Sequence, residues 1–433
     1  MALLDKNLRE VRIGCIGLSG RGMGQMGELL SVPGVIVPAV CDVYEDRVLD
    51  GAKLVEEKSG ARPQIYTDYK RMLANEKLDA VLCCTTWITH GRIAADTMRA
   101  GCHVALEVGG AASTEECWQM VRASEETGKF CMLLENCCYD RNEMAVFRME
   151  REGVFGEVVH CEGGYRHDLR DEIAYGRENR HGRLANFIHR NGELYPTHQL
   201  GPIAKLLRIN RGNRFLSLAS VASKARGLHE FIHREKGPNY YLANQEFNCG
   251  DIVTTMIKCA NGETIRLTHD CTLPRPYSRD YCVQGTKACF QEGPVGLGGV
   301  MYIDGVSPHA DWTGAWEPFS KYLDQYEHPL WKAYGEAGIH ANGHGGMDYL
   351  VLSAFADAVQ RDAPPPIDVY DTAAWMAITA LSEQSAAMGG MPVPVPDFTN
   401  GMWIEREPFR RGTFCLEEVC GEFFTGEGQS RAV

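Results

Sequence analysis

A glycine-rich turn near the start of the chain constrains its fold most strongly. Apolar residues 11–16 lead into Gly17-Leu18-Ser19-Gly20-Arg21-Gly22, and residues 23–30 have a composition typical of a helix. A second apolar run, residues 35–41, ends in Asp42. This acid follows the turn by about 20 residues, the spacing of a dinucleotide-binding unit. The sequence therefore predicts a strand, a tight turn, a helix and a second strand.

Each residue of the turn has a candidate role in such a unit. Backbone N–H groups and the positive end of the helix dipole would face a pyrophosphate. The candidate cofactor-binding residues of the turn are therefore Gly17, Ser19, Gly20, Arg21 and Gly22. Asp42 is expected to hydrogen-bond the adenosine ribose, which predicts NAD as the cofactor. A literal glycine motif at residues 22–27 begins one turn too late, so we interpret its glycines as packing positions. Taken alone, the turn is also compatible with a glycine-rich loop that binds nothing.

Strand-like and helix-like stretches alternate as far as residue 134. This order predicts a parallel, doubly wound sheet, in which ligands bind at the carboxyl ends of the strands. The polar and aromatic residues at those ends are therefore expected to face one crevice: Thr85, Thr86, Trp87, His90, Glu107 and Glu135. We expect all of them except Thr86 to contact the cofactor. The alternative is that they are ordinary polar residues at strand ends.

The pattern changes after Gly156, where longer alternating strands begin. Asn261-Gly262 separates two of these strands and is a strong hairpin signal. The predicted fold class is α/β: an N-terminal Rossmann dinucleotide-binding domain, then a C-terminal α+β domain with a large, mostly antiparallel open sheet. The predicted domains are residues 1–140 and 141–433.

Composition excludes several classes of protein. A net charge of −13 argues against a nucleic-acid partner, and 44% apolar content without a long apolar run argues against a membrane protein. The first ten residues lack the cationic start and apolar core of a secretory signal, so we expect the cytoplasm. The 17 cysteines form no C-x-x-C pair, so we expect buried thiols and no metal site.

This domain order resembles the superfamily of glucose-fructose oxidoreductase and inositol dehydrogenase. Sugar dehydrogenases of that superfamily carry Glu-Lys-Pro after the fifth strand and Asp-x-x-x-His in the second domain. Here the first motif reads Glu107-Val108-Gly109, and Leu194 stands four residues before His198. The lysine and the aspartate are therefore both replaced.

The replaced positions and several long stretches are similar to glycoside hydrolase family 109, the NAD-dependent α-N-acetylgalactosaminidases. The stretches are residues 134–139, 163–170, 190–198, 210–214, 223–229, 275–277, 344–349 and 397–401. The resemblance implies a glycosidase that uses NAD without net redox: oxidation at C3, loss of the C2 proton, elimination of the aglycone from C1, water addition and reduction.

The resemblance also implies residue roles. Tyr165 is the candidate base at C2, and His198, before a helix, is the candidate for the C3 hydroxyl proton. The candidate substrate-binding residues are Glu135, Tyr195, Tyr277 and His344. For Tyr165 the alternative is a core tyrosine, and for His198 it is a histidine bonded to backbone at a helix entry.

Two other functions remain open. One is an NAD-dependent sugar or polyol dehydrogenase, against which the replaced lysine and aspartate count. The other is a non-enzymatic NAD-sensing regulator on the same fold, against which the presence of both Tyr165 and His198 counts. We expect a carbohydrate substrate and a homo-oligomer built on a dimer.

Overall fold

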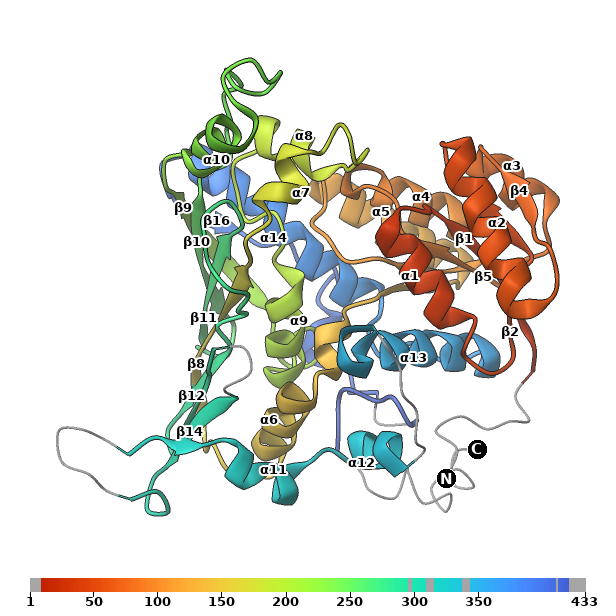
Figure 1. The fold of residues 1–433 in the computed structure, drawn as a ribbon. Helices are drawn as coiled ribbons and strands as arrows, with labels where there is room; N and C mark the ends of the chain where they lie inside the picture. Colours follow the sequence, from red (N-terminus) through yellow and green to blue (C-terminus); the bar gives the residue numbers. More distant parts are fainter. Residues whose placement is uncertain (1–8, 295–297, 309–314, 337–342, 410–411, 420–433) are drawn as a thin grey trace.

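The computed structural model describes residues 9–294, 298–308, 315–336, 343–409 and 412–419. Two sheets stand apart in the molecule, with helices between them (Figure 1). The first sheet is parallel and the second is mostly antiparallel. The predicted fold class is therefore confirmed. None of the helices within the described residues is long and apolar enough to cross a membrane.

The first sheet has the strand order β4-β3-β1-β5-β6-β7, with β2 paired to β1. Buried aliphatic and cysteine side chains fill β3, β5 and β7 and most of β1 and β6, as expected for strands covered on both faces, whereas the edge strand β4 is largely exposed. Its strands are β1 (Val11–Ile16), β2 (Val35–Ile36), β3 (Ala39–Cys41), β4 (Gln64–Tyr66), β5 (Ala80–Cys83), β6 (His103–Leu106) and β7 (Cys131–Leu133). Its helices are α1 (Gly20–Leu29), α2 (Glu45–Ser59), α3 (Tyr69–Asn75), α4 (Trp87–Arg99) and α5 (Thr114–Thr127).

Two predicted boundaries in this half were wrong. The helix after the glycine turn begins at Gly20, three residues earlier than predicted, because the extended residue Ser19 is already its N-cap. The apolar run 35–41 is not one strand, since β2 ends at Ile36 and β3 starts at Ala39. Pro38 lies in the gap and has no N–H to donate to a neighbouring strand.

The second sheet has the order β15-β14-β13-β12-β8-β11-β10-β9-β16. The predicted hairpin at Asn261-Gly262 is confirmed, because it joins antiparallel β10 and β11 and Gly262 has a φ of 109°. Only β8 and β11 pair in parallel. The strands are β8 (Val158–Arg166), β9 (Phe215–Ala222), β10 (Ile252–Cys259), β11 (Thr264–Asp270), β12 (Cys282–Gly285), β13 (Ala288–Glu292), β14 (Gly299–Ile303), β15 (Glu317–Pro318) and β16 (Val393–Pro394).

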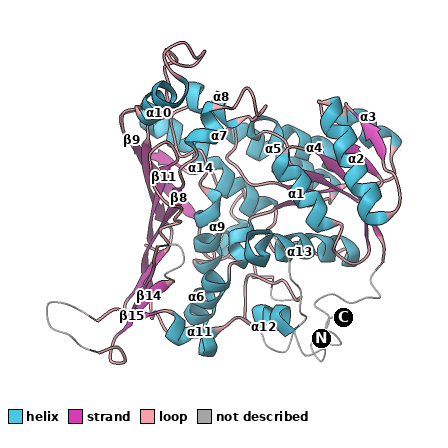
Figure 2. Cartoon of the chain, in the orientation of Figure 1, coloured by secondary structure: helices cyan, strands magenta, loops and turns pink. Residues whose placement is uncertain are grey.

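Helices of the second half fill the space between the two sheets (Figure 2). The long α14 contacts both α5 and β9, and it is buried on all sides around Trp375. The helices are η1 (Asn136–Tyr139), α6 (Arg141–Arg151), α7 (Arg170–Ala174), α8 (Arg183–His189), α9 (Thr197–Leu206), α10 (Gly227–Lys236), α11 (Ser320–Tyr326), α12 (Pro329–Glu336), η2 (Gly343–Gly346), α13 (Met347–Arg361), α14 (Val369–Ala387) and η3 (Met402–Ile404). The division at residue 140 stays a prediction.

Candidate active site

The glycine turn has the shape of a phosphate cradle. Gly17 has a φ of 89°, and a Cβ there would lie 2.5 Å from the carbonyl oxygen of Cys84. A Cβ on Gly22 would lie 1.9 Å from the carbonyl oxygen of Gly17, whereas Gly20 faces open space. The Ser19 side chain makes no cap hydrogen bond, which leaves N–H groups of the first turn of α1 for an anion. These features fit the pyrophosphate of a dinucleotide.

Asp42 follows β3, beside the turn. Its carboxylate accepts hydrogen bonds from the backbone N–H groups of Leu18, at 2.7 Å, and Tyr44, at 3.0 Å. The side chain is therefore fixed at the carboxyl end of the strand, where a dinucleotide ribose would lie.

Arg21 joins the turn to the second half of the chain. Its guanidinium forms ion pairs with Glu107, at 3.2 Å, and with Asp348 of α13, at 2.7 Å. His344 also lies here, with Nδ1 at 2.8 Å from the Asp348 carboxylate. The structure thus places His344 beside Arg21 and Asp348, and its role in substrate binding stays a prediction.

The loop after β5 carries three of the predicted cofactor contacts. Thr85 Oγ1 accepts a hydrogen bond from Thr89 at 2.8 Å, and Trp87 begins α4. His90 is fully buried, and its Nε2 lies 2.9 Å from the carbonyl oxygen of Thr85. This hydrogen bond and the burial hold the His90 ring against the loop, and its contact with the cofactor stays a prediction.

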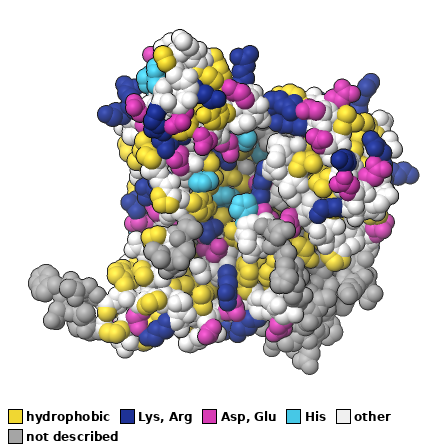
Figure 3. Space-filling view, viewed as in Figure 1, with side chains coloured by type: hydrophobic (Ala, Val, Ile, Leu, Met, Phe, Trp, Pro, Cys, Tyr) yellow, Lys and Arg dark blue, Asp and Glu magenta, His cyan; other side chains and the backbone are white. Residues whose placement is uncertain are grey.

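Four aromatic residues meet where the two halves of the chain face each other. The Tyr195 ring lies 4.5 Å from the Tyr165 ring and 5.4 Å from the Trp87 ring, centroid to centroid. Tyr277 is 6.1 Å from Tyr165. In the space-filling view, histidine side chains lie along this boundary (Figure 3). The structure thus brings together residues far apart in the sequence.

His198 and Glu135 form a buried pair beside these rings. His198 Nδ1 lies 2.8 Å from Glu135 Oε1, and the His198 ring is 5.4 Å from Tyr165. Burial raises the pKa of Glu135, but the His198 charge and hydrogen bonds outweigh it and lower the pKa overall. A carboxylate only accepts, so Nδ1 carries the proton of this hydrogen bond, and Nε2 is the nitrogen that has a lone pair in the neutral imidazole.

Glu135 is fully buried and orients the His198 imidazole, and its contacts with the cofactor and the substrate stay predictions. One expectation about this pair is corrected. His198 was expected before a helix, yet it is the second residue of α9, because Pro196 caps that helix and lets it begin at Thr197.

Arg183, the first residue of α8, was not identified from the sequence. Its guanidinium lies 5.0 Å from the Tyr195 ring, 5.2 Å from Trp87 and 5.8 Å from Tyr165. Its Nε forms a 2.7 Å ion pair with Glu172. No motif surrounds Arg183 in the sequence, so only the tertiary structure could reveal it.

Tyr165 has two polar neighbours that could change its protonation. Burial raises the pKa of Tyr165 to about 12, and the positive charge of Arg183 opposes this rise. His167 Nδ1 lies 3.4 Å from the Tyr165 hydroxyl. The pKa of His167 is lowered by burial and by Arg183, which favours a neutral imidazole that can accept a proton.

Glu135, Cys137 and His198 place one potential metal-ligand atom each within 4.8 Å of the others. However, Arg279 Nη1 donates to Cys137 Sγ at 2.9 Å. A metal cation at this position would face the guanidinium, so the cluster is better suited to proton transfer than to metal binding.

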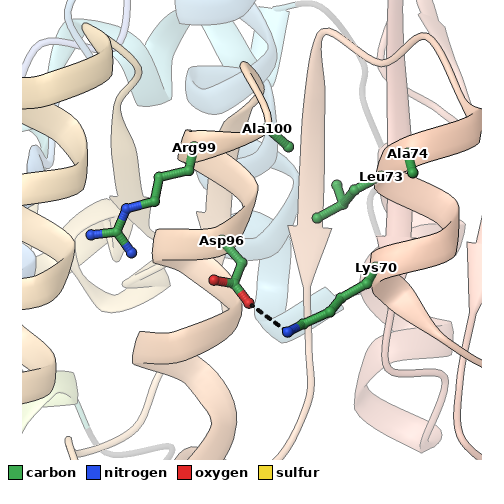
Figure 4. Close-up of a pocket in the computed structure, with 6 residues that line it drawn as sticks. All are labelled: Lys70, Leu73, Ala74, Asp96, Arg99 and Ala100. Carbon is green, nitrogen blue, oxygen red and sulfur yellow. Dashed lines mark ion pairs between the residues drawn. The ribbon is translucent and has the colours of Figure 1, made fainter.

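A separate hollow of about 510 Å³ lies between α3 and α4. In Figure 4 the side chains of Lys70 and Asp96 point toward each other across it, and they form a 3.9 Å ion pair. Its wall includes Arg99 at the end of α4, which leads to the amino end of β6. This is the wrong edge of the sheet for a nucleotide.

Two family models match successive parts of the chain. Residues 11–134 match the model of the oxidoreductase family with an NAD-binding Rossmann fold, which confirms the predicted NAD-binding domain. Residues 139–405 match the model of the C-terminal domain of glycosyl hydrolase 109.

Similar proteins extend over nearly the whole chain. An alpha-N-acetylgalactosaminidase of Tannerella forsythia is 42% identical, covering 92% of this chain and 88% of the relative. A glycosyl hydrolase family 109 protein of Parabacteroides distasonis is 40% identical over 92% of this chain and 89% of its own length. A solved levoglucosan dehydrogenase, in complex with NADH and L-sorbose, has the same fold, with a TM-score of 0.67 at 17% identity over 90% of this chain and all of its own. The chain therefore belongs to glycoside hydrolase family 109.

Proposed function

We propose that this chain hydrolyses terminal α-linked N-acetylgalactosaminides by a cycle of oxidation, elimination, water addition and reduction. The observation that carries the proposal is the juxtaposition of His198, backed by Glu135, with the buried Tyr165, backed by His167. Two proton acceptors beside one another suit a reaction that removes protons from neighbouring sugar atoms. The relatives named alpha-N-acetylgalactosaminidase support the choice of sugar.

The first proton acceptor serves the oxidation at C3. When bound, NAD supplies an acceptor for the C3 hydride and returns that hydride at the end of the cycle. His198 Nε2 takes the C3 hydroxyl proton, because Nδ1 is committed to Glu135. The Glu135 carboxylate then stabilises the imidazolium, as carboxylates do in catalytic triads.

The second proton acceptor serves the elimination. The C3 ketone makes the C2 proton acidic, and Tyr165 takes up this proton in its tyrosinate form. The C2–H electron pair becomes a double bond to C1, and the aglycone leaves with the C1–O pair. Arg183 stabilises the tyrosinate, because its charge lies over the same ring.

Arg183 also has a nitrogen to offer to the sugar. Within the described part of the chain, its Nη1 is buried without a hydrogen-bond partner. A buried unpartnered donor is costly, and a sugar hydroxyl or an N-acetyl carbonyl oxygen would satisfy it. The rings of Tyr195 and Tyr277 provide flat apolar surfaces for the sugar ring.

Solvent exchange at C2 tests this function. The enzyme is incubated with p-nitrophenyl N-acetyl-α-D-galactosaminide in deuterium oxide, and the released sugar is analysed by NMR. Proton removal at C2 predicts deuterium at that carbon, whereas direct displacement at C1 leaves the C2–H bond intact. Free N-acetylgalactosamine incubated with the enzyme is the control for exchange after release.

Two outcomes would contradict the proposal. Release of p-nitrophenol without deuterium at C2 would exclude the elimination. Stoichiometric reduction of added NAD by the free sugar, without bond cleavage, would identify the dehydrogenase alternative. That alternative has less support, because Val108 and Leu194 are buried apolar residues that cannot transfer protons.

A further inference from the structure

A loop of the second half crosses the carboxyl edge of the first sheet. Residues 175–183, which we call the strap, connect α7 to the first residue of α8. The strap contacts residues that follow β3 and residues that follow β5. Because β1 lies between these two strands, the strap passes across the end of β1, where the glycine turn begins.

Arg180 anchors the strap on the β3 side. It donates two hydrogen bonds to the Asp46 carboxylate, at 2.9 and 2.7 Å. Arg47 donates to the backbone carbonyl of Asn179 at 3.1 Å. The Tyr44 ring contacts both guanidinium groups, at 4.9 Å from Arg47 and 4.4 Å from Arg180. This side of the strap therefore rests on charge-assisted hydrogen bonds and cation–π contacts.

The other end of the strap packs on the loop after β5. A Cβ on Gly182 would lie 2.7 Å from the Thr86 methyl group, so a side chain there would push the two loops apart. The next residue, Arg183, lies over the Trp87 ring at 5.2 Å. The strap thus touches both sides of the predicted nucleotide crevice.

Tyr44 links Arg180 to the predicted ribose ligand. The Arg180 guanidinium lies over the Tyr44 ring, and the Tyr44 N–H donates to the Asp42 carboxylate at 3.0 Å. The backbone of Arg180 is left-handed, with a φ of 51°, a conformation that a non-glycine residue keeps only when its surroundings impose it. The two hydrogen bonds to Asp46 supply that constraint.

We propose that the strap is part of the dinucleotide-binding site, where it covers the adenosine half of NAD and limits the rate of its release. Tyr44 and Arg180 form a flat, cationic surface next to Asp42, which suits an adenine ring and the adjoining phosphates. The proposal rests on the NAD-binding domain and is independent of the proposed hydrolysis.

The rate of NAD exchange tests the strap. Protein loaded with radiolabelled NAD is mixed with excess unlabelled NAD, and retained label is followed over time. Arg180→Ala should accelerate release by about 5- to 30-fold, since it removes an exposed ion pair and a cation–π contact. High salt should accelerate release from the wild type more than from the variant, because salt screens exposed charges.

Two further variants distinguish retention of NAD by the strap from a general effect on the structure. Arg62→Ala is the matched control. It breaks an exposed 2.9 Å ion pair with Glu56, which lies on α2 like Asp46 but away from the strap. This variant should release NAD at the wild-type rate. A double variant that exchanges the two members of the ion pair, Asp46→Arg with Arg180→Asp, should recover slow release of NAD. Wild-type release from a normally folded Arg180→Ala variant, or equal acceleration in Arg62→Ala, would overturn the proposal.

Discussion

Asp42 should determine the choice between NAD and NADP. Its carboxylate is held at the end of β3 by the N–H groups of Leu18 and Tyr44. A 2′-phosphate would meet this negative charge at close range, where the repulsion amounts to about 1 to 4 kcal/mol. We expect NAD to bind at least about 10-fold more tightly than NADP in equilibrium titrations. Equal or tighter binding of NADP would contradict the assigned role of Asp42.

Removing the Tyr165 hydroxyl should affect chemistry more than binding. Tyr165→Phe should lower turnover by about 10²- to 10⁴-fold, the usual range for a general base, with a smaller change in KM. Tyr277→Phe is the control, because it removes a hydroxyl from a neighbouring ring assigned only to binding.

The pH dependence of turnover is a second test of Tyr165 as the base. Burial keeps the phenol protonated by raising its pKa to about 12, so the tyrosinate fraction grows as the pH rises toward that value. Wild-type turnover should therefore rise on the alkaline side, and the Phe variant should lose the rise. A variant with the same alkaline limb as the wild type would exclude Tyr165 as the base.

At the scale of elements, a buried charge cluster joins α9, α14 and the C-terminal segment. Asp371 of α14 pairs with Lys205 of α9, at 2.7 Å, and with Arg211, at 2.8 Å. Glu417 pairs with the same Lys205 at 2.7 Å. Burial raises the pKa of Asp371, but Arg211 and Lys205 lower it further, so the carboxylate stays charged. The cluster fixes the far end of the helix that carries His198.

Asp371→Asn should destabilise the fold. The substitution removes one of the carboxylates that neutralise the buried Lys205 and Arg211 and leaves Glu417 as their shared partner, which costs up to about 3 to 5 kcal/mol. The free energy of unfolding in urea measures this cost. Glu57→Gln is the control, because it breaks an exposed pair with Lys53 and should change stability by less than about 1 kcal/mol. A similar small change in both variants would show that the cluster contributes little to stability.

At the scale of the whole molecule, the second sheet leaves one face without helices. The described helices lie on the opposite face (Figure 1), while Val221 and Met256 on the open face are 59% and 41% exposed. We propose a homo-oligomer built on a dimer across this face. Light scattering should give at least twice the mass of one chain. Met256→Asp should lower that mass, whereas Ile65→Asp on β4 should not; a single-chain mass at all concentrations would contradict the proposal.

Buried histidines should make the whole fold sensitive to acid. Burial lowers the pKa of His90 to about 4 and that of His269 to about 3, from an ordinary value of 6.5. The unfolded chain therefore binds more protons than the folded chain below pH 6.5. Each histidine should reduce the free energy of unfolding by about 1.4 kcal/mol per pH unit between 6.5 and its folded pKa. Urea titrations at pH 7, 6 and 5 should show the slope, and a His90→Gln, His269→Gln double variant should reduce it.

The sequence by itself determined the order of elements and the class of cofactor. The glycine turn, Asp42 and the alternation of short apolar strands with helices are local patterns. Strand burial and turn geometry restrict the residue types within a few neighbouring positions, so the sequence shows them directly. The Asn261-Gly262 hairpin was predictable for the same reason. Tyr165 and His198 were found through stretches that resemble a known family, and they remain candidates whose roles the experiments above will test.

Only the tertiary structure decided which side chains meet. Arg183 and the strap carry no sequence signal, because their partners Trp87, Tyr165 and Asp46 come from distant parts of the chain. Strand-end position predicted ligand contacts for both His90 and Glu135, but only the packing shows that His90 contacts Thr85 and that Glu135 contacts His198. Sequence patterns record the average environment of a residue along its own element, whereas a site depends on contacts between elements, which exist only once the two halves have packed together.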